Sequence, residues 1–412
     1  MIQTKTLENG VRVIVKRMEG LLSVSMGVLV GTGAAFETDR EDGISHFIEH
    51  MLFKGTEKRT AFEISDAFDS LGAQVNAFTG KDLTCYYSKA TSDHAAEAFA
   101  LLADLFLNSV FPEEEMAREK GVVVEEINMD EDSPEDLCLD LLSRAAFGSA
   151  NYGRNILGTA ENVNGFTRED LRAYRKERYC PENVVASFAG SIEPAEAIAL
   201  AEEYFGGMQR TSFREREKKV VWQGGSLFRK KPIEQAHFAL AFPSVRREDV
   251  SRPAVQLMNA IFGGGMSSRL FKRVREELGL AYSVYSYSTH YLETGLLTVY
   301  AGVNPAKAKD AAEAVRAVIA EMQSGGVSEA EFLRGREQLK ASSIYSQENT
   351  SAQMLLYGKE MLYNNAVYDF EKRMAEISAL TRDDVAAAIA EGFDFSRAAV
   401  ASVGNLDEAI KV

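Results

Sequence analysis

The chain has 412 residues, of which 46% are hydrophobic and 26% are charged, and its formal net charge is −15 at pH 7. This much apolar material can bury a sizeable core, so the composition excludes a disordered chain and predicts two or more domains. The acidic balance argues against nucleic acid as a partner and favours basic partners through long-range attraction.

Targeting and redox signals are sparse. Residues 1–6 lack a basic segment followed by an apolar run, and no stretch approaches the ~20 apolar residues that span a bilayer. Cys85, Cys138 and Cys180 are an odd set without C-x-x-C spacing, which favours reduced, buried thiols over disulfides. We therefore expect a cytoplasmic protein without a membrane span.

The first elements in chain order predict a sheet. Val11, Val13 and Val15 occupy alternate positions after an Asn9–Gly10 turn, and a second apolar run covers residues 24–30; both patterns are typical of strands. Beyond residue 60 we expect a helix over 61–71, a strand pair over 73–90, a helix over 93–108 and a helix that opens at Pro112.

Residues 43–53 predict an amphipathic helix with a metal-binding polar face. At about 100° per residue, one face is apolar, while His46, Glu49 and His50 lie on the opposite face. Histidines at positions i and i+4 lie one turn apart, so their ring nitrogens can bind one ion. We interpret H-x-x-E-H, the reverse of H-E-x-x-H, as a Zn²⁺ site with Glu49 as the adjacent base.

The alternative for this segment is an ordinary solvated helix face. Only five histidines occur in the chain, and two of them fall here at ligand spacing, which favours the metal site. A catalytic zinc usually takes three protein ligands, and the helix after Pro112 is the best source of the third. Its candidates are Glu119, Glu125 and Glu126.

Three motifs of the first half recur in the second half. Residues 167–171 resemble 381–385, residues 183–190 resemble 397–404, and residues 112–116 resemble 328–332. The offsets are 214, 214 and 216 residues. Three matches in the same order at nearly one offset predict a duplicated domain of about 200 residues.

The duplication sets the expected organisation. We predict an N-terminal metal-binding domain over 1–210, a charged and turn-rich linker over 211–227 and a C-terminal copy over 228–412. Because strands and following helices are mixed in each copy, we expect an α+β fold in which each domain is a mainly antiparallel sheet with helices packed on one face. Segment 251–262 of the second copy has no histidine, so only the first copy can hold this metal.

The H-F-I-E-H motif at 46–50, together with E-K-G-V-V-V-E-E at 119–126, resembles the pitrilysin and insulinase family of zinc peptidases. More narrowly, it resembles the bacterial branch similar to mitochondrial processing peptidase. The resemblance implies one Zn²⁺ per chain, held by His46, His50 and Glu126. It also implies a supporting role for Glu119, which lies two helical turns earlier on the same face and would orient a ligand or support the base.

Further motifs extend the resemblance to both halves. The stretch Asn76, Ala77, Phe78 and Thr79 resembles the family's edge strand, which binds substrate by strand addition. The glycine-rich segment 263–271 and residues 275–282 resemble the family segment whose Arg and Tyr reach the substrate carbonyl, and these roles carry over to Arg275 and Tyr282. Without the family, Asn76 would be an ordinary turn residue, Arg275 half of a surface ion pair and Tyr282 part of the core.

The resemblance implies a zinc endopeptidase that cleaves unfolded peptides or presequence-like segments inside an enclosed chamber. Glu49 would act as general base and then as general acid, while Arg275 and Tyr282 would hold the substrate carbonyl. Because one chain carries both the metal motif and the Arg/Tyr pair, we expect a homodimer. The net charge favours basic peptides as substrates.

Two alternatives remain open. Some family members are non-catalytic subunits of processing-peptidase-like complexes, but these usually lose a metal ligand, whereas this chain retains all four letters of the metal site. A zinc hydrolase of small molecules is disfavoured by the duplicated domain and by the substrate strand.

Overall fold

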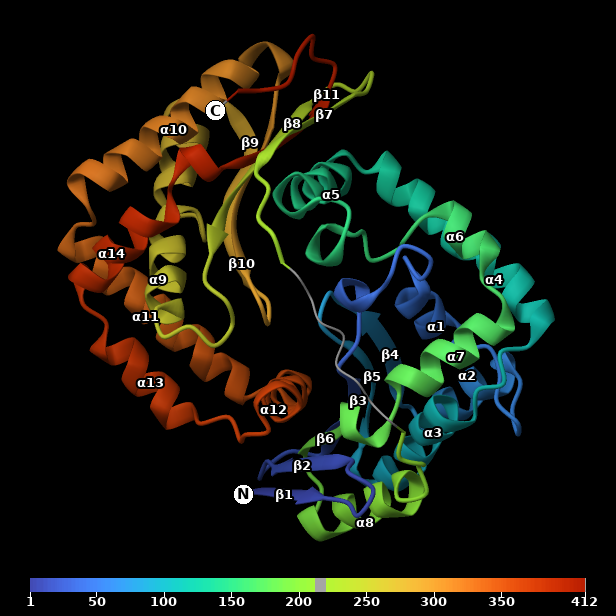
Figure 1. The fold of residues 1–412 in the computed structure, drawn as a ribbon. Coiled ribbons are helices and arrows are strands. Elements are labelled where there is room, and N and C mark those ends of the chain that lie inside the picture. Colours follow the sequence, from blue (N-terminus) through green and yellow to red (C-terminus); the bar gives the residue numbers. More distant parts are fainter. Residues whose placement is uncertain (212–219, 412) are drawn as a thin grey trace. The chain divides into compact units, whose positions relative to one another are not determined.

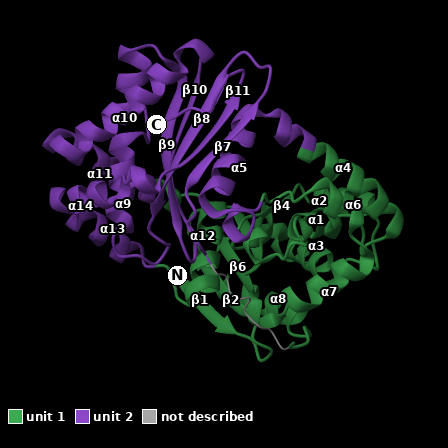
Figure 2. Cartoon of the chain, turned by 45° about the horizontal axis from the view of Figure 1, so that its top comes forward, with its two compact units in different colours: residues 1–127, 155–217, 345–368 green, residues 128–154, 218–344, 369–412 purple. Residues whose placement is uncertain are grey.

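The structure, a computed structural model, describes residues 1–211 and 220–411, so part of the predicted linker at 211–227 lies outside the described residues. The chain forms two compact units, which Figure 2 shows in different colours. Unit 1 comprises residues 1–127, 155–217 and 345–368, and unit 2 comprises residues 128–154, 218–344 and 369–412. Among the helices of the described ranges, none has both the length and the apolar character that crossing a bilayer requires.

Unit 1 is built on a six-stranded sheet with the order β1-β2-β6-β3-β5-β4 (Figure 1). Neighbouring strands are antiparallel except for β2 and β6, which are parallel. The strands are β1 (Ile2–Thr6), β2 (Arg12–Arg17), β3 (Ser23–Val30), β4 (Gln74–Thr79), β5 (Thr84–Thr91) and β6 (Val184–Gly190). Strand β4 forms one edge of this sheet and pairs there with β5.

Helices cover one face of this sheet and share a single apolar core with it. The core includes Val28 and Phe188 from the strands and Phe47 and Phe99 from the helices. The helices are α1 (Ile44–Leu52), α2 (Ala61–Ser70), α3 (Ala95–Asn108), α4 (Glu113–Asp132), α6 (Ala160–Gly165), α7 (Arg168–Arg178) and α8 (Pro194–Phe205). The last residues of α4 belong to unit 2.

Unit 2 follows the same plan with a five-stranded sheet of order β7-β11-β8-β10-β9. Only β7 and β11 are parallel neighbours in it. Its strands are β7 (Gly225–Lys230), β8 (Ala236–Ser244), β9 (Ala281–His290), β10 (Gly295–Val303) and β11 (Ala399–Gly404). Its helices are α9 (Arg252–Phe262), a π-helical turn (Phe271–Glu277), α10 (Ala308–Gly325), α11 (Glu329–Gln347), α13 (Phe370–Ala379) and α14 (Arg382–Gly392).

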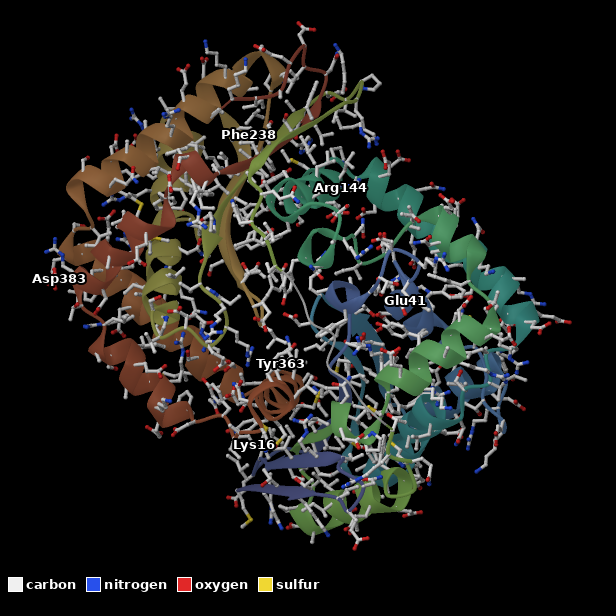
Figure 3. The ribbon with its side chains drawn as sticks, in the orientation of Figure 1. Lys16, Glu41, Arg144, Phe238, Tyr363 and Asp383 are labelled. Atoms are coloured by element: carbon white, nitrogen blue, oxygen red, sulfur yellow. The ribbon has the colours of Figure 1, made fainter. Side chains whose placement is uncertain are left out.

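The two units exchange one helix each. Helix α5 (Pro134–Phe147) follows α4 in the chain but packs on β7, β8 and β11 of unit 2. Helix α12 (Thr350–Asn364) follows α11 but packs on β2, β3 and β6 of unit 1. Figure 3 labels Tyr363 on α12 and Lys16 on β2, which belong to the same unit although they come from opposite ends of the chain.

Helix α12 covers the face of the unit 1 sheet that the other helices leave open. Met354 and Tyr357 form a second core there with Leu29 and Val185. Leu29 alternates along β3 with Val28, which belongs to the first core, so the two cores lie on opposite faces of the sheet. Both faces of the sheet are therefore covered.

The repeated motifs of the sequence mark the same elements in both units. The Thr-Arg-acid-Asp motifs at 167–170 and 381–384 are capping boxes that begin α7 and α14. In each, the threonine hydroxyl accepts the backbone N–H of the aspartate, and the aspartate accepts the backbone N–H of the threonine. The second repeat forms β6 and β11, and the third begins α4 and α11.

The expected α+β fold with two mainly antiparallel sheets is confirmed. The sequence pattern does not predict the helix on the second face of each sheet. The boundaries 1–210 and 228–412 remain a prediction; the compact units differ from them by the exchanged segments 128–154 and 345–368.

Candidate metal centre

The N-terminus of α1, the helix that carries His46, Glu49 and His50, is held by a residue outside the helix. The helix begins after Gly43, which has φ of 95° and no side chain to cap it. Glu37 replaces the missing cap, since its two carboxylate oxygens accept the backbone N–H groups of Gly43 and Ser45, each at 2.8 Å. Burial raises the pKa of Glu37 to about 7, although these two hydrogen bonds act to lower it.

Three predicted ligands meet in unit 1. Potential ligand atoms of His46, His50 and Glu126 all lie within 4.8 Å of one another. The Oε2 of Glu126 lies 3.3 Å from Nε2 of His50 and 3.8 Å from Nε2 of His46. Ligand atoms at about 2.1 Å from a tetrahedral zinc are about 3.4 Å apart, so this donor set of two imidazoles and one carboxylate fits zinc.

Glu119 holds the far side of one ligand ring. Its Oε1 lies 2.8 Å from Nδ1 of His50, and its Oε2 lies 2.7 Å from Nζ of Lys54. Burial alone would raise the pKa of Glu119, but the hydrogen bonds to His50 and Lys54 outweigh burial and lower it. An ionised Glu119 accepts the Nδ1–H of His50, which leaves the Nε2 lone pair of that ring available for a metal.

The two histidines differ electrostatically. Burial, together with the neighbouring His50, lowers the pKa of His46 to about 4, which keeps this ring neutral. Burial also acts to lower the pKa of His50, but the hydrogen bond to Glu119 and the nearby carboxylates raise it overall.

Glu49 lies between the ligands and the edge strand. Its Oε2 accepts a hydrogen bond of 2.5 Å from Oγ1 of Thr79 on β4. Burial raises the pKa of Glu49, although the bond from Thr79 and the charge of His50 oppose this shift. The predicted base and the predicted substrate strand are thus directly connected.

The four predicted substrate-binding residues form the C-terminal part of β4. Because side chains alternate along a strand, Ala77 and Thr79 share the face of α1, and Asn76 and Phe78 lie on the face of α12. Phe78 packs there near Tyr87, with ring centroids 6.4 Å apart. β4 is a sheet edge in unit 1, and an edge strand offers unpaired backbone groups to an extended peptide.

Arg275 and Tyr282 lie together, but in unit 2. The guanidinium carbon of Arg275 lies 4.7 Å from the ring centroid of Phe271 and 4.9 Å from that of Tyr282. Both residues line a pocket of about 460 Å³ that also contains Lys307. Tyr282 is 77% exposed, so it does not belong to the core. The catalytic roles of this pair remain predictions.

Several residues that support the site were missed by sequence reasoning. Lys54 lies one helical turn beyond His50, a spacing that could have suggested a partner for a carboxylate near that ring. The link between Thr79 and Glu49 joins positions 30 residues apart, and no local pattern signals it. Glu37 and Ser45 also gave no signal, because an acidic residue or a serine near a helix start is common.

Comparison with known proteins shows sequence relatives over most of the chain. Residues 12–160 match the family described as insulinase, peptidase family M16, and residues 165–339 match the peptidase M16 inactive domain. An uncharacterized zinc protease of Bacillus subtilis is 39% identical over 408 residues, covering 98% of this chain and all of that protein. One of Streptomyces coelicolor is 34% identical over 94% of this chain and 86% of that protein.

Solved structures share the fold. A peptidase M16 inactive domain from Pseudomonas fluorescens superposes with a TM-score of 0.92 at 22% identity, covering all of this chain and 99% of that one. A protease from Helicobacter pylori gives 0.93 at 20% identity, covering 98% and 99%. The sequence matches span nearly the whole chain and include the segments that carry the metal site, and the chain belongs to the pitrilysin and insulinase family of peptidases, M16.

Proposed function

We propose that the protein is a zinc-dependent endopeptidase that cleaves unfolded peptides or presequence-like segments. The observation that carries this proposal is the convergence of ligand atoms from His46, His50 and Glu126, with Glu49 on the same helix. The names of its relatives as zinc proteases support the assignment of metal and reaction class.

The residues of the site have distinct roles in this proposal. A zinc ion held by His46, His50 and Glu126 would supply a Lewis acid that polarises the scissile carbonyl and makes water more acidic. Glu49 would accept the proton of the attacking water and donate it to the leaving amine. Glu119, through its bond to His50, would keep that ring oriented and in the tautomer that binds metal.

The edge strand β4 supports an extended substrate. A peptide that pairs with β4 would align next to Thr79, whose hydroxyl contacts Glu49, so strand pairing would bring a backbone carbonyl near the base. Strand addition requires an extended backbone, and this favours unfolded segments over folded proteins. The net charge of −15 would favour basic segments if acidic residues surround their path.

The proposed assembly is a homodimer located in the cytoplasm. The metal residues and the pair Arg275 and Tyr282 occur in different units of one chain, so two copies could provide each other with the complementary half of a chamber. The three cysteines are free and buried, as a reducing compartment would allow. Sedimentation at micromolar concentration is expected to give a mass near twice that of the chain.

Mixing variants tests whether Arg275 acts across the interface. A dimer of one Glu49→Gln subunit and one Arg275→Ala subunit would then have one doubly defective site and one intact site, so activity would return on mixing. An active monomer, or no recovery despite demonstrated subunit exchange, would rule out the cross-subunit arrangement.

A non-catalytic partner subunit is the second candidate. The family name matched by residues 165–339 describes an inactive domain, which makes this possibility worth testing. The candidate ligands and Glu49 are all present in unit 1, whereas a scaffold has no need to keep them.

One experiment separates the two candidates. The protein and a Glu49→Gln variant are incubated with a peptide mixture, and the products are identified by mass spectrometry before and after removal of metal by a chelator. An endopeptidase gives products that disappear in the variant and after chelation, while the variant keeps its zinc because the amide preserves the shape of the side chain. Absence of cleavage by the zinc-loaded parent protein would favour the partner subunit.

A further inference from the structure

We infer that Tyr174 is a positioning residue for the metal centre, acting through Ser45 of the metal-binding helix; this inference rests on the proposed function. Tyr174 lies on α7, 2% exposed, and was singled out by no sequence motif. Its hydroxyl bonds to Thr32 and to Ser45, the residue before the proposed ligand His46. Its effect on the metal would therefore be indirect.

The hydroxyl of Tyr174 joins three elements of unit 1. It lies 2.9 Å from Oγ of Ser45 in the first turn of α1 and 2.8 Å from Oγ1 of Thr32, just after β3. Ser45 and Thr32 are both fully buried. A phenol hydroxyl can donate one hydrogen bond and accept another, so one group satisfies both side chains and fixes α1 to α7 and to the sheet.

Ser45, which bonds to Tyr174, is close in sequence to the proposed ligand His46 and the proposed base Glu49. Ser45 immediately precedes His46, and it lies one turn before Glu49 on the same side of α1. The backbone N–H of Ser45 also donates to Glu37, so both the side chain and the backbone of this residue are held. Because α1 carries two proposed ligands and the proposed base, a small rotation of its first turn would displace all three groups relative to Glu126.

The far end of α1 is held separately. Oγ of Ser109 donates to the backbone carbonyl of Met51 at 3.2 Å, and Lys54 binds Glu119. Loss of the Tyr174 contact would therefore loosen only the N-terminal turn, where His46 lies and where Glu37 still binds the backbone. This predicts a change in the geometry of metal binding without loss of the fold.

Tyr179, the residue after the end of α7, provides a matched control. Tyr179 follows α7 and is also buried, and its hydroxyl lies 2.9 Å from that of Tyr86 on β5. Replacing either tyrosine by phenylalanine removes one buried hydroxyl and leaves a partner hydroxyl without that bond. Only Tyr174→Phe removes a bond to α1.

The test measures metal binding by the full chain. Zinc affinity is determined by competition with a chromophoric chelator, and the visible spectrum of the Co²⁺-loaded protein reports ligand geometry. Tyr174→Phe is expected to weaken zinc binding about tenfold, the lower end of the range for groups that orient metal ligands, and to change the Co²⁺ spectrum. Tyr179→Phe is expected to leave both readouts as in the parent, even if it lowers stability equally.

A second pair keeps the inference testable if Tyr174→Phe does not fold. Ser45→Ala removes the other partner of the same bond, and Ser25→Ala is its control, since Ser25 is equally buried and bonds to Thr350 of α12 instead. The double variant Tyr174→Phe/Ser45→Ala is expected to bind zinc no more weakly than Tyr174→Phe alone.

The outcomes separate this inference from the proposed function. If the parent protein and His46→Ala bind zinc equally, the proposed metal centre is wrong, and the inference falls with it. If the parent binds zinc at the site but Tyr174→Phe and Ser45→Ala match their controls in affinity and Co²⁺ spectrum, the positioning role alone is wrong.

Discussion

Nδ1 of His50 lies 2.8 Å from Oε1 of Glu119, a residue 69 positions later in the chain. This contact joins helix α1 to helix α4, which also carries Glu126. The partner of Nδ1 determines which nitrogen of the ring remains for a metal. Glu119 thus contacts one candidate ligand without being within the group of three.

We predict that Glu119→Gln weakens zinc binding by about 10- to 100-fold. The amide can still accept a hydrogen bond from His50, but it lacks the charge that stabilises the ring and that binds Lys54. Chelator competition measures the effect. Glu114→Gln, on the exposed side of the same helix, is the matched control, and equal affinities of the two variants would contradict the role of Glu119.

Glu126→Gln is predicted to weaken zinc binding more strongly than Glu125→Gln. Glu126 contributes to the three-residue group, whereas Glu125 is adjacent on α4 and exposed. Elemental analysis after dialysis against a weak chelator is expected to show loss of zinc from Glu126→Gln only. Full occupancy in that variant, with loss in Glu125→Gln, would transfer the third ligand to the neighbouring carboxylate.

The part of the candidate site on α1 could be predicted from the sequence because its residues are close together along the chain. His46, Glu49 and His50 are within one and a half turns of one helix, so spacing alone places them together. The third candidate ligand could not be chosen by spacing, because three glutamates of the same helix were available and only the family resemblance selected Glu126. Lys54, Thr79 and Tyr174 make tertiary contacts near the candidate site, and the spacing of residues along a single sequence does not reveal such contacts.

Acid is predicted to weaken unit 2 through the ion pair between Glu331 and Arg269. Nε and Nη2 of Arg269 donate to the two carboxylate oxygens at 2.7 and 2.8 Å. This pairing, with help from Ser328, lowers the pKa of Glu331 to about 2. The folded pKa is below the unfolded value of 4.5, so the stabilisation is present above pH 4.5 and is lost as the pH falls towards 2.

Glu331→Gln measures this contribution. At pH 7 the variant is expected to be less stable than the parent by about 1–3 kcal/mol, the range for hydrogen bonds to charged groups, and the difference is expected to shrink below pH 4.5. Urea unfolding followed by the fluorescence of Trp222, the single tryptophan of the chain, reports on unit 2. The control is Glu329→Gln, at an exposed position of the same helix; a pH-independent difference between the two variants would contradict the assigned pKa.

The fold was predictable to the level of two similar α+β units, because the capping motifs and strands recur at nearly one offset. The exchange of α5 and α12 was not predictable in this way. An apolar helix face indicates that the helix is buried, but it does not identify the sheet that buries it. The packing of α12 on its sheet depends on a close approach at Gly358, because a side chain at this position would contact Leu29 of β3.

Gly358→Ala is therefore predicted to destabilise unit 1. A Cβ atom at this position would lie 2.7 Å from Cδ1 of Leu29 and 3.1 Å from Cβ of Ser187, so the buried Leu29 side chain, the helix or the sheet must shift. Overpacking of this kind costs about 1–3 kcal/mol, which exceeds the ~0.5–1 kcal/mol that alanine gains over glycine inside a helix.

Gly121→Ala provides the control, because Gly121 lies within α4 and a Cβ there would have no neighbour within 4 Å. Only the helix-propensity gain remains, so this variant is expected to be as stable as the parent or slightly more stable. Urea unfolding followed by far-UV circular dichroism compares the two variants, and Trp222 fluorescence separates the response of unit 2. Equal stability of Gly358→Ala and Gly121→Ala would mean that α12 does not pack closely on β3, and that the exchanged helix is not a fixed part of unit 1.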